Sequence, residues 1–296
     1  MKKIVSALVL AGMVGASGVV MAEETSPHTL SANVSLVSNY VFRGVSQTQN
    51  GPAIQGGFDY SHASGFYIGT WASNVDWVSQ GYMTNNSMEI DLYGGFKGAV
   101  DDFGYDVGVI TYYYPGDEIS GANDPNTTEI YLGASWKFLS AKYSYTASNQ
   151  FVGWGTTADP TGETQGSYYI EANANYEIAD GWGVQGHVGY QSVKDNDNAS
   201  YTDYKLGVTK NIGFGTLGLA YTIPMRMKPP TPGRRARALK KSLTVTGLCL
   251  SPRASKPAFS VPAIPGERGR SGRIGATKSG DGYEIRNGNH QAVQAG

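Results

Sequence analysis

Apolar and polar residues alternate with a period of two along most of the chain. Between residues 88 and 97, for example, Ile90 and Leu92 alternate with Glu89 and Asp91. Successive side chains of a β-strand point to opposite faces, so this alternation predicts strands with one apolar and one polar face. Because such segments repeat with little helical periodicity between them, we expect an all-β protein.

About eleven strand-like segments precede residue 222 when the alternation is followed along the chain. They begin near Thr29, Ala53, Phe66, Met88, Phe103, Thr128, Leu139, Ser167, Trp182, Thr202 and Thr216. Residues with strong turn preference separate them, such as Asn50-Gly51-Pro52 and Asp180-Gly181. Short turns alternate with long connections, which predicts that the long ones share one end of the sheet.

Two all-β architectures fit this pattern. In a soluble sandwich, the apolar faces pack on each other and the polar faces meet water. In an outer-membrane barrel, the apolar face meets lipid and the polar face lines a lumen. Segments of roughly ten residues match the length that a tilted strand needs to cross a bilayer. Bacterial barrels have even strand numbers, so we expect an antiparallel transmembrane β-barrel of about 12 strands.

The first 22 residues have the pattern of an export signal. Lys2 and Lys3 precede an apolar, small-residue run, and Val20-Met21-Ala22 presents small residues where signal peptidase cleaves. The alternative is a membrane-anchoring helix, since the run is long enough to span. A cleaved signal predicts a mature protein that begins at Glu23, exported to the envelope of a Gram-negative bacterium and located in its outer membrane.

Charge divides the chain into two dissimilar parts. Residues 1–222 hold 9 Lys and Arg against 21 Asp and Glu, a net charge of −12, whereas residues 223–296 hold 14 against 3, a net charge of +11. The overall net charge of −1 is therefore a sum of two opposite excesses. The single cysteine excludes a disulfide scaffold and a cysteine-based zinc site. We predict a signal peptide at 1–22, a barrel at 23–222 and a separate basic tail at 223–296.

Several ordered segments resemble a known family. They are Ser38 to Thr48 (SNYVFRGVSQT), Gly65 to Val75 (GFYIGTWASNV), Glu89 to Phe96 (EIDLYGGF) and Glu129 to Ala134 (EIYLGA). Together they are similar to a proteobacterial family of porin-like proteins, the TorF-like group, across residues 23–222. The resemblance implies an outer-membrane β-barrel and leaves the transported solute unassigned.

The C-terminal region departs from that resemblance, because similar proteins end with a strand that closes on an aromatic residue. Here Pro and Arg residues follow Thr222, and the tail is expected to be disordered. We interpret residues 223–296 as the product of an altered reading frame; the alternatives are a basic tail that binds nucleic acid or lipopolysaccharide, and a periplasmic linker. Ser242 to Leu250 (SLTVTGLCL) is the one tail segment that could supply a closing strand.

The polar faces of the predicted strands identify lumen-lining candidates. These are Asn39, Arg43, Asp59, Glu89, Asp91, Asp106, Glu129, Lys142 and Glu171. Acidic residues outnumber basic ones on these faces, and rings of carboxylates favour cations, so we expect a mild cation preference. Alternatively, the charges pair across strands and fill a closed lumen.

Aromatic residues cluster near the ends of the predicted strands, as they do in the girdles at the two membrane interfaces. The girdle candidates are Tyr40, Phe42, Trp71, Tyr113, Trp136 and Trp182.

Three functions remain open from the sequence. The first is a channel for passive diffusion of small solutes, and the second is a non-conducting structural or adhesive barrel. The third is a lipolytic enzyme built on His187, Ser167 and Asn173, but no nucleophile elbow accompanies these residues, and we do not expect an enzyme. Expected partners are outer-membrane lipids, lipopolysaccharide, the barrel-assembly machinery and small solutes, with no nucleic acid, cofactor or metal.

Overall fold

The computed structural model describes residues 26–225 and 242–250, the latter segment and Met225 by their backbone alone. Twelve antiparallel strands form one closed barrel. They are β1 (His28–Val37), β4 (Ala53–His62), β5 (Phe66–Asn74), β7 (Met88–Val100), β8 (Phe103–Tyr113), β10 (Thr127–Trp136), β11 (Leu139–Thr146), β12 (Tyr168–Ala179), β13 (Trp182–Ser192), β14 (Tyr201–Asn211), β15 (Gly215–Met225) and β16 (Ser242–Leu250). The predicted fold class and strand number are confirmed.

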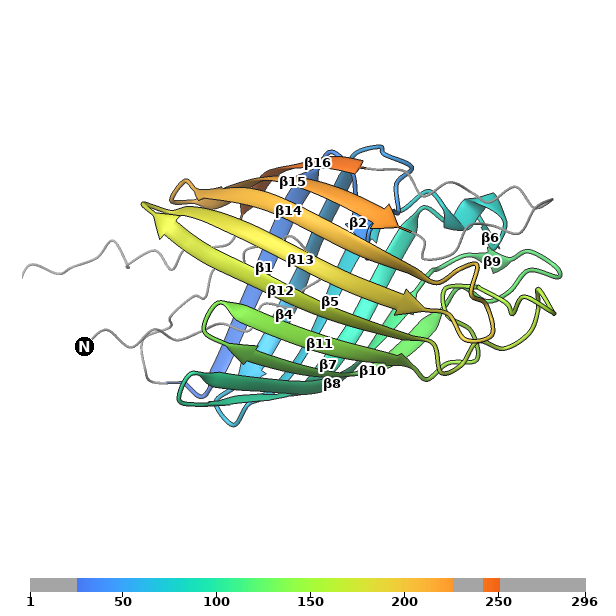
Figure 1. Ribbon diagram of the computed structural model, residues 1–296, viewed down its shortest axis with the longest axis horizontal. Coiled ribbons are helices and arrows are strands. Elements are labelled where there is room, and N and C mark those ends of the chain that lie inside the picture. The colour runs from blue at the N-terminus through green and yellow to red at the C-terminus, as the bar shows by residue number, and fades with distance from the viewer. Residues whose placement is uncertain (1–25, 226–241, 251–296) are drawn as a thin grey trace, which may run out of the picture. The chain divides into compact units, whose positions relative to one another are not determined.

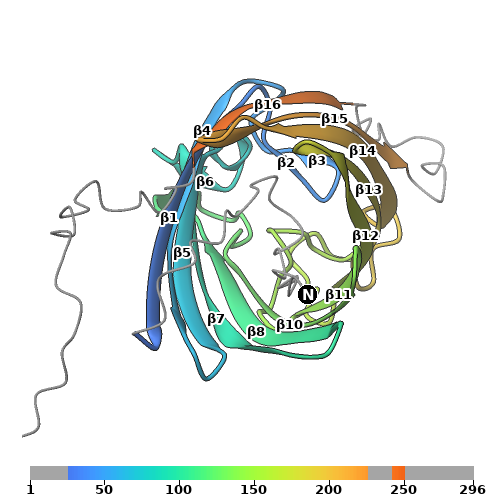
Figure 2. The same cartoon turned by 90° about the vertical axis from the view of Figure 1, so that its left-hand side faces the viewer.

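Each barrel strand pairs with its neighbours in chain order, so the sheet is an up-and-down meander (Figure 1). The ring closes where β16 pairs with both β15 and β1, and β1 pairs on its other edge with β4. Looking along the ring, the strands enclose a central space, and the short strands β2 (Val41–Phe42) and β3 (Val45–Ser46) lie inside it (Figure 2).

Large apolar side chains cover the outside of the barrel. Phe58, Leu132 and Leu206 are 70%, 61% and 72% exposed, although each lies within a strand. The opposite faces of the strands carry polar and often buried side chains, such as Glu129 on β10 and Asp203 on β14. An exposed apolar surface around a polar interior is the arrangement of a transmembrane barrel, in which lipid covers the outer face.

All short turns lie at one end of the barrel and all long connections lie at the other. The short-turn end carries residues 63–65, 101–102, 137–138, 180–181 and 212–214, and the long-loop end carries 38–52, 75–87, 114–126, 147–167 and 193–200. The long loops contain small structure of their own: the 3-10 turn η1 (Val78–Gln80) and the pair β6 (Met83–Thr84) and β9 (Asp117–Glu118). The predicted alternation of turn lengths is confirmed.

Within residues 26–225 and 242–250, no helix is long and apolar enough to cross a bilayer.

The predicted boundary between barrel and tail needs a correction. β15 continues to Met225, beyond the predicted limit at residue 222, and Ser242–Leu250 forms β16 inside the predicted tail. Disorder throughout 223–296 is therefore wrong for these segments, because residues 223–225 pair with β14 and β16 pairs with the free edges of β1 and β15. The signal peptide at 1–22 lies outside the described residues, and an altered reading frame stays a prediction that sequencing the 3′ end of the gene tests.

A charge on the outer face should destabilise the barrel much more than a charge on the inner face. Leu132 lies at the middle of β10 and faces outward. Leu132→Arg is expected to lower the free energy of unfolding in lipid vesicles by about 2–4 kcal/mol, the cost of an arginine at the bilayer midplane. Gln185→Arg on the inner face of β13 is the control and should change it by less than about 1 kcal/mol; equal effects would contradict the assignment of the faces.

Candidate functional site

The connection between β1 and β4 folds into the barrel rather than away from it (Figure 2). It contains the hairpin of β2 and β3, and the backbone N–H of Gln47 donates to the carbonyl of Tyr40 to close its base (2.7 Å). Buried Asn39 fixes the same base, because the Ser46 hydroxyl donates to its side-chain oxygen at 2.6 Å. We call residues 40–47 the inner hairpin.

Arg43 at the tip of the inner hairpin joins it to the opposite wall. Its guanidinium donates to both carboxylate oxygens of Glu129 on β10 (2.9 and 2.6 Å) and to the side-chain oxygen of Gln191 on β13 (3.0 Å). The guanidinium also lies 4.4 Å from the ring centre of Tyr169 and 4.8 Å from that of Phe42. A bidentate ion pair with aromatic faces beside it holds Arg43 in one position across the lumen.

The tip of the inner hairpin requires an unusual backbone. Arg43 and Gly44 have φ values of 45° and 79°, in the left-handed region that glycine favours. A Cβ on Gly44 would lie 2.5 Å from the Cβ of Asp203 on β14. Gly44 therefore allows both the turn and the close approach of the tip to the wall.

Charge and burial fix the protonation states of Arg43 at the tip of the inner hairpin and of Tyr40 at its base. Burial alone would lower the pKa of Arg43, but the adjacent Glu129 carboxylate outweighs it, and the pKa lies above its ordinary value. Burial, and then the charge of Glu89, raise the pKa of Tyr40 well above its usual range. Arg43 thus stays a cation and Tyr40 stays a hydrogen-bond donor at physiological pH.

Tyrosine hydroxyls satisfy most of the buried carboxylates inside the barrel. Tyr40 and Tyr114 each donate to Glu89 at 2.6 Å, one to each oxygen. Tyr67 donates to Asp106 at 2.7 Å. The same pairing joins Tyr93 to Asp59 (2.6 Å), Tyr112 to Glu129 (3.3 Å) and Tyr169 to Asp203 (2.8 Å). Each tyrosine hydroxyl is a neutral donor that stabilises a carboxylate by a hydrogen bond, which accounts for many of the tyrosines on the polar faces.

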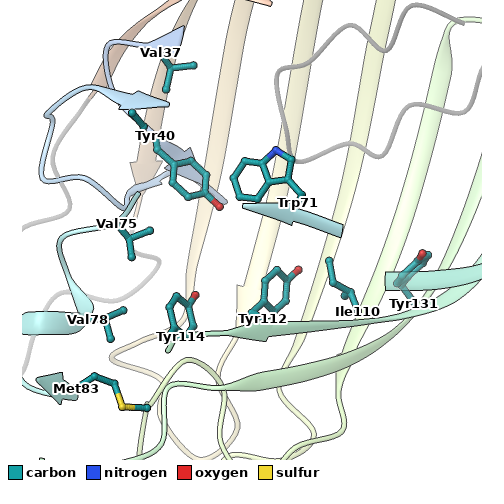
Figure 3. Packing of buried hydrophobic residues seen from close by; sticks show 11 residues of the cluster. Val37, Tyr40, Trp71, Val75, Val78, Met83, Ile110, Tyr112, Tyr114 and Tyr131 are labelled. Carbon is teal, nitrogen blue, oxygen red and sulfur yellow. The ribbon is translucent and has the colours of Figure 1, made fainter. Parts of the chain in front are cut away.

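Buried aromatic side chains form a cluster beside the inner hairpin. Tyr40, Trp71, Tyr112 and Tyr114 belong to it, and the rings of Tyr40 and Trp71 meet edge to face at 5.4 Å (Figure 3). The cluster combines residues of β5, of β8 and the position after it, and of the inner hairpin, and it extends to Val75, Val78 and Met83 in the 75–87 connection (Figure 3). It therefore lines the interior at the level of the hairpin.

The predicted aromatic girdle is wrong for three of its members. Tyr40 and Trp71 are buried inside the barrel, and Phe42 packs on the inner cluster against Tyr112. Inside the barrel, these rings supply the hydrogen-bond donors and apolar contact surface on which the inner hairpin packs. Tyr113, Trp136 and Trp182 are exposed at strand ends, as a girdle requires, and their role at the membrane interface stays a prediction.

All nine lumen candidates lie on the inner side. Asn39, Arg43, Glu89, Asp91, Asp106, Glu129 and Glu171 are buried, and Asp59 and Lys142 are half-buried. The Lys142 amine lies 4.3 Å from the ring centre of Tyr131, and the Asn173 amide donates to Glu171 at 3.2 Å. Sequence reasoning missed Gln191, because a single polar residue gives no sign of the hairpin that docks on it.

The residues of the hypothetical hydrolase do not assemble. His187 contacts Asn173 at 2.7 Å and Asp203 at 2.9 Å. The Ser167 hydroxyl donates instead to the carbonyl of Thr164 and accepts the backbone N–H of Lys194. In the described part of the chain, no group of three or more His, Cys, Asp or Glu is arranged to hold a metal ion.

Breaking the Arg43–Glu129 pair from one side should be costly. Arg43→Met leaves a buried carboxylate without its base, which typically costs about 3–5 kcal/mol. We expect urea unfolding in lipid vesicles to show a loss of this size. The double variant Arg43→Met/Glu129→Gln should recover most of it, because no unpaired charge remains. Additive losses in the two single variants would contradict a direct pair.

The chain was compared with curated protein sequences and with solved structures. No curated protein sequence matches the chain. Among solved structures, the KdgM porin is 7% identical, with 75% of this chain and 98% of that chain covered and a TM-score of 0.44. The NanC porin is 12% identical, with 75% and 98% covered and a TM-score of 0.44. OpdK from Pseudomonas aeruginosa is 12% identical, with 78% and 67% covered and a TM-score of 0.34.

The family profile matches residues 21–246, which include the inner hairpin, every strand from β1 to β15 and the first half of β16. Its members are described as bacterial proteins of unknown function. The chain belongs to the Gcw_chp family.

Proposed function

We propose that the protein is an outer-membrane channel for passive diffusion of small solutes, narrowed by the inner hairpin. The observation that carries the proposal is a closed barrel with an apolar exterior and a charged interior. An apolar outer face requires lipid, and polar residues along the inner face give water and solutes a path. The hairpin sets the narrowest level of that path.

Exposure changes along the inner face in a way that supports a narrow level near the hairpin. On β12, Glu171 and Asn173 are buried, whereas Asn175 and Glu177, nearer the short turns, are exposed. On β7 the inner positions likewise pass from buried Glu89 to exposed Lys97. The lumen is therefore wide toward the short-turn end and filled by side chains near the hairpin.

Charge at the narrow level supports a mild cation preference as part of the proposal. Glu89, Asp91 and Glu129 lie close enough to interact electrostatically. Arg43 pairs with Glu129, and no basic side chain of residues 26–224 forms an ion pair with Glu89 or Asp91. A net negative constriction attracts cations and repels anions.

Location and partners complete the proposal. A cleaved signal at residues 1–22 would export the chain, and outer-membrane lipids and lipopolysaccharide would surround the apolar face. The barrel-assembly machinery would insert it, and the resemblance to the TorF-like group belongs to the same proposal. Bacterial barrels have short turns on the periplasmic side and long loops on the outside, so the short-turn end of this barrel would face the periplasm.

A non-conducting barrel is the second candidate, and one observation favours it. Glu129 and Gln191, which hold the tip of the inner hairpin, are each 0% exposed, so water does not reach the wall behind the hairpin in this conformation. A permanently filled lumen would leave binding to the long loops. The two candidates differ in whether purified protein conducts ions.

Shortening the inner hairpin should widen the channel. Residues 41–46 are replaced by Gly-Gly, which the backbone bond between Tyr40 and Gln47 allows without moving the ends apart. We expect single-channel conductance in planar bilayers to rise at least about twofold, because the narrowest level sets the resistance of a pore. The control shortens the exposed loop at 157–161 and should leave conductance unchanged. If neither wild type nor the hairpin variant conducts, the protein is a closed barrel.

Selectivity is measured by the reversal potential in a KCl gradient. The wild-type channel is expected to prefer K⁺ over Cl⁻. Arg43→Gln should increase that preference, because it removes the positive charge at the narrow level. A wild-type channel that prefers anions contradicts the acidic lumen.

A further inference from the structure

Asp91 differs from the other buried carboxylates of the interior. Its side chain is 0% exposed, and neither carboxylate oxygen has a hydrogen-bond partner among the described residues. Glu89 accepts two tyrosine hydroxyls, and Glu129 pairs with Arg43. An uncompensated carboxylate in a dry interior is strongly unfavourable, so Asp91 takes up either a proton or a positively charged partner.

Strand register places an aromatic residue on each side of Asp91. Trp71 on β5 and Tyr112 on β8 are its direct cross-strand neighbours. Both rings are buried on the inner side, and Figure 3 shows them in the cluster beside the inner hairpin. Directly opposed residues of an antiparallel pair lie about 5 Å apart, so the rings flank the carboxylate.

Other charges near Asp91 increase its need for a cation. Glu89 and Glu129 repel its charge, and the hydroxyls of Tyr40 and Tyr114 are both used by Glu89. The nearest cation of the hairpin, Arg43, is held on Glu129 by two hydrogen bonds. The surrounding side chains therefore leave the negative charge of Asp91 unbalanced.

The chemistry of the position selects one class of cation. A metal ion is disfavoured because no three His, Cys, Asp or Glu of the described residues converge to hold one. An ammonium group suits the site, since it donates hydrogen bonds to a carboxylate and is attracted to the faces of aromatic rings.

We propose that Asp91, flanked by Trp71 and Tyr112, binds the ammonium group of a small organic amine that enters the lumen. The site lies at the buried level of β7, where the lumen is narrow, and the inner face of β7 runs from it through half-buried Tyr93 and Gly95 to exposed Lys97 toward the short-turn end. The proposal rests on the proposed channel and names the solute class that its constriction recognises. Binding itself does not require that the solute pass the hairpin.

The first test measures binding of ethylammonium chloride to the full chain in detergent by isothermal titration calorimetry. Asp91→Asn keeps the shape of the side chain and removes its charge. We expect this variant to bind ethylammonium at least about tenfold more weakly than wild type, as loss of a charged hydrogen-bonding partner predicts. Glu177→Gln removes one exposed acid from β12 and is the control, with affinity unchanged.

A second pair of variants tests the aromatic contribution. Tyr112→Leu removes the ring face and is expected to weaken binding about threefold or more, whereas Tyr112→Phe keeps the face and should retain affinity. This pair tests the site even if Asp91→Asn fails to fold. The proposal is overturned if wild type binds no ethylammonium, in which case a proton or water satisfies Asp91, or if Asp91→Asn binds as tightly as wild type.

Bilayer recording separates this proposal from the channel proposal. Ethylammonium binding by a protein that shows no conductance would overturn the channel and leave the site. Conductance without ethylammonium binding would overturn the amine site and leave the channel proposal standing.

Discussion

Closure of the sheet is the constraint on which the other features of this protein depend. Within a bilayer every backbone N–H and C=O needs a partner inside the protein, and a closed antiparallel barrel supplies one for each. The pairing of β16 with both β1 and β15 completes the ring. Once the ring is closed, the alternation of each strand sends apolar side chains to lipid and confines polar ones to a single interior.

That confinement explains the chemistry of the interior. The charged groups placed there by the strand period cannot all reach bulk water, so hydrogen bonds must stabilise them in place. Tyrosine hydroxyls serve Glu89, Asp106 and Asp59, and a bidentate arginine serves Glu129. The inner hairpin is part of this solution, because it carries Arg43 and Tyr40 from one side of the ring to carboxylates on other strands. Asp91 is the one of these acids that finds no such partner in the part of the chain that the structure describes.

Sequence reasoning succeeded where a local pattern carries the information. Period-two alternation located eleven strands before residue 222, and Ser242–Leu250, the one tail segment that could supply a closing strand, forms β16. The polar parity also identified the inward acids, such as Glu89 and Glu129. These are properties of a strand and its two faces, and they do not depend on distant parts of the chain.

Sequence reasoning failed where the answer depends on a contact between segments that are distant in the chain. Tyr40 has the composition and position of a girdle residue, and only the inward folding of residues 38–52 shows that it lies inside the barrel. Trp71 is a different case, because it shares the inward parity of β5 with buried Tyr67 and Ser73. The segment from Ser38 to Thr48 contributed to the family resemblance, but nothing in it predicted that its Arg43-Gly44 turn forms the tip of a hairpin inside the barrel. Nothing within that segment encodes the positions of Glu129 and Gln191, which lie on other strands.

The anchoring of Arg43 also has a consequence for the order of assembly. Its two partners, Glu129 and Gln191, lie 86 and 148 positions further along the chain. Contacts of such long sequence separation form late, since the intervening chain must be ordered first. The wall that contains β10 and β13 must therefore exist before the hairpin can dock. Arg43 can reach both of its partners only in a chain whose strands β10 and β13 are already in place in the wall.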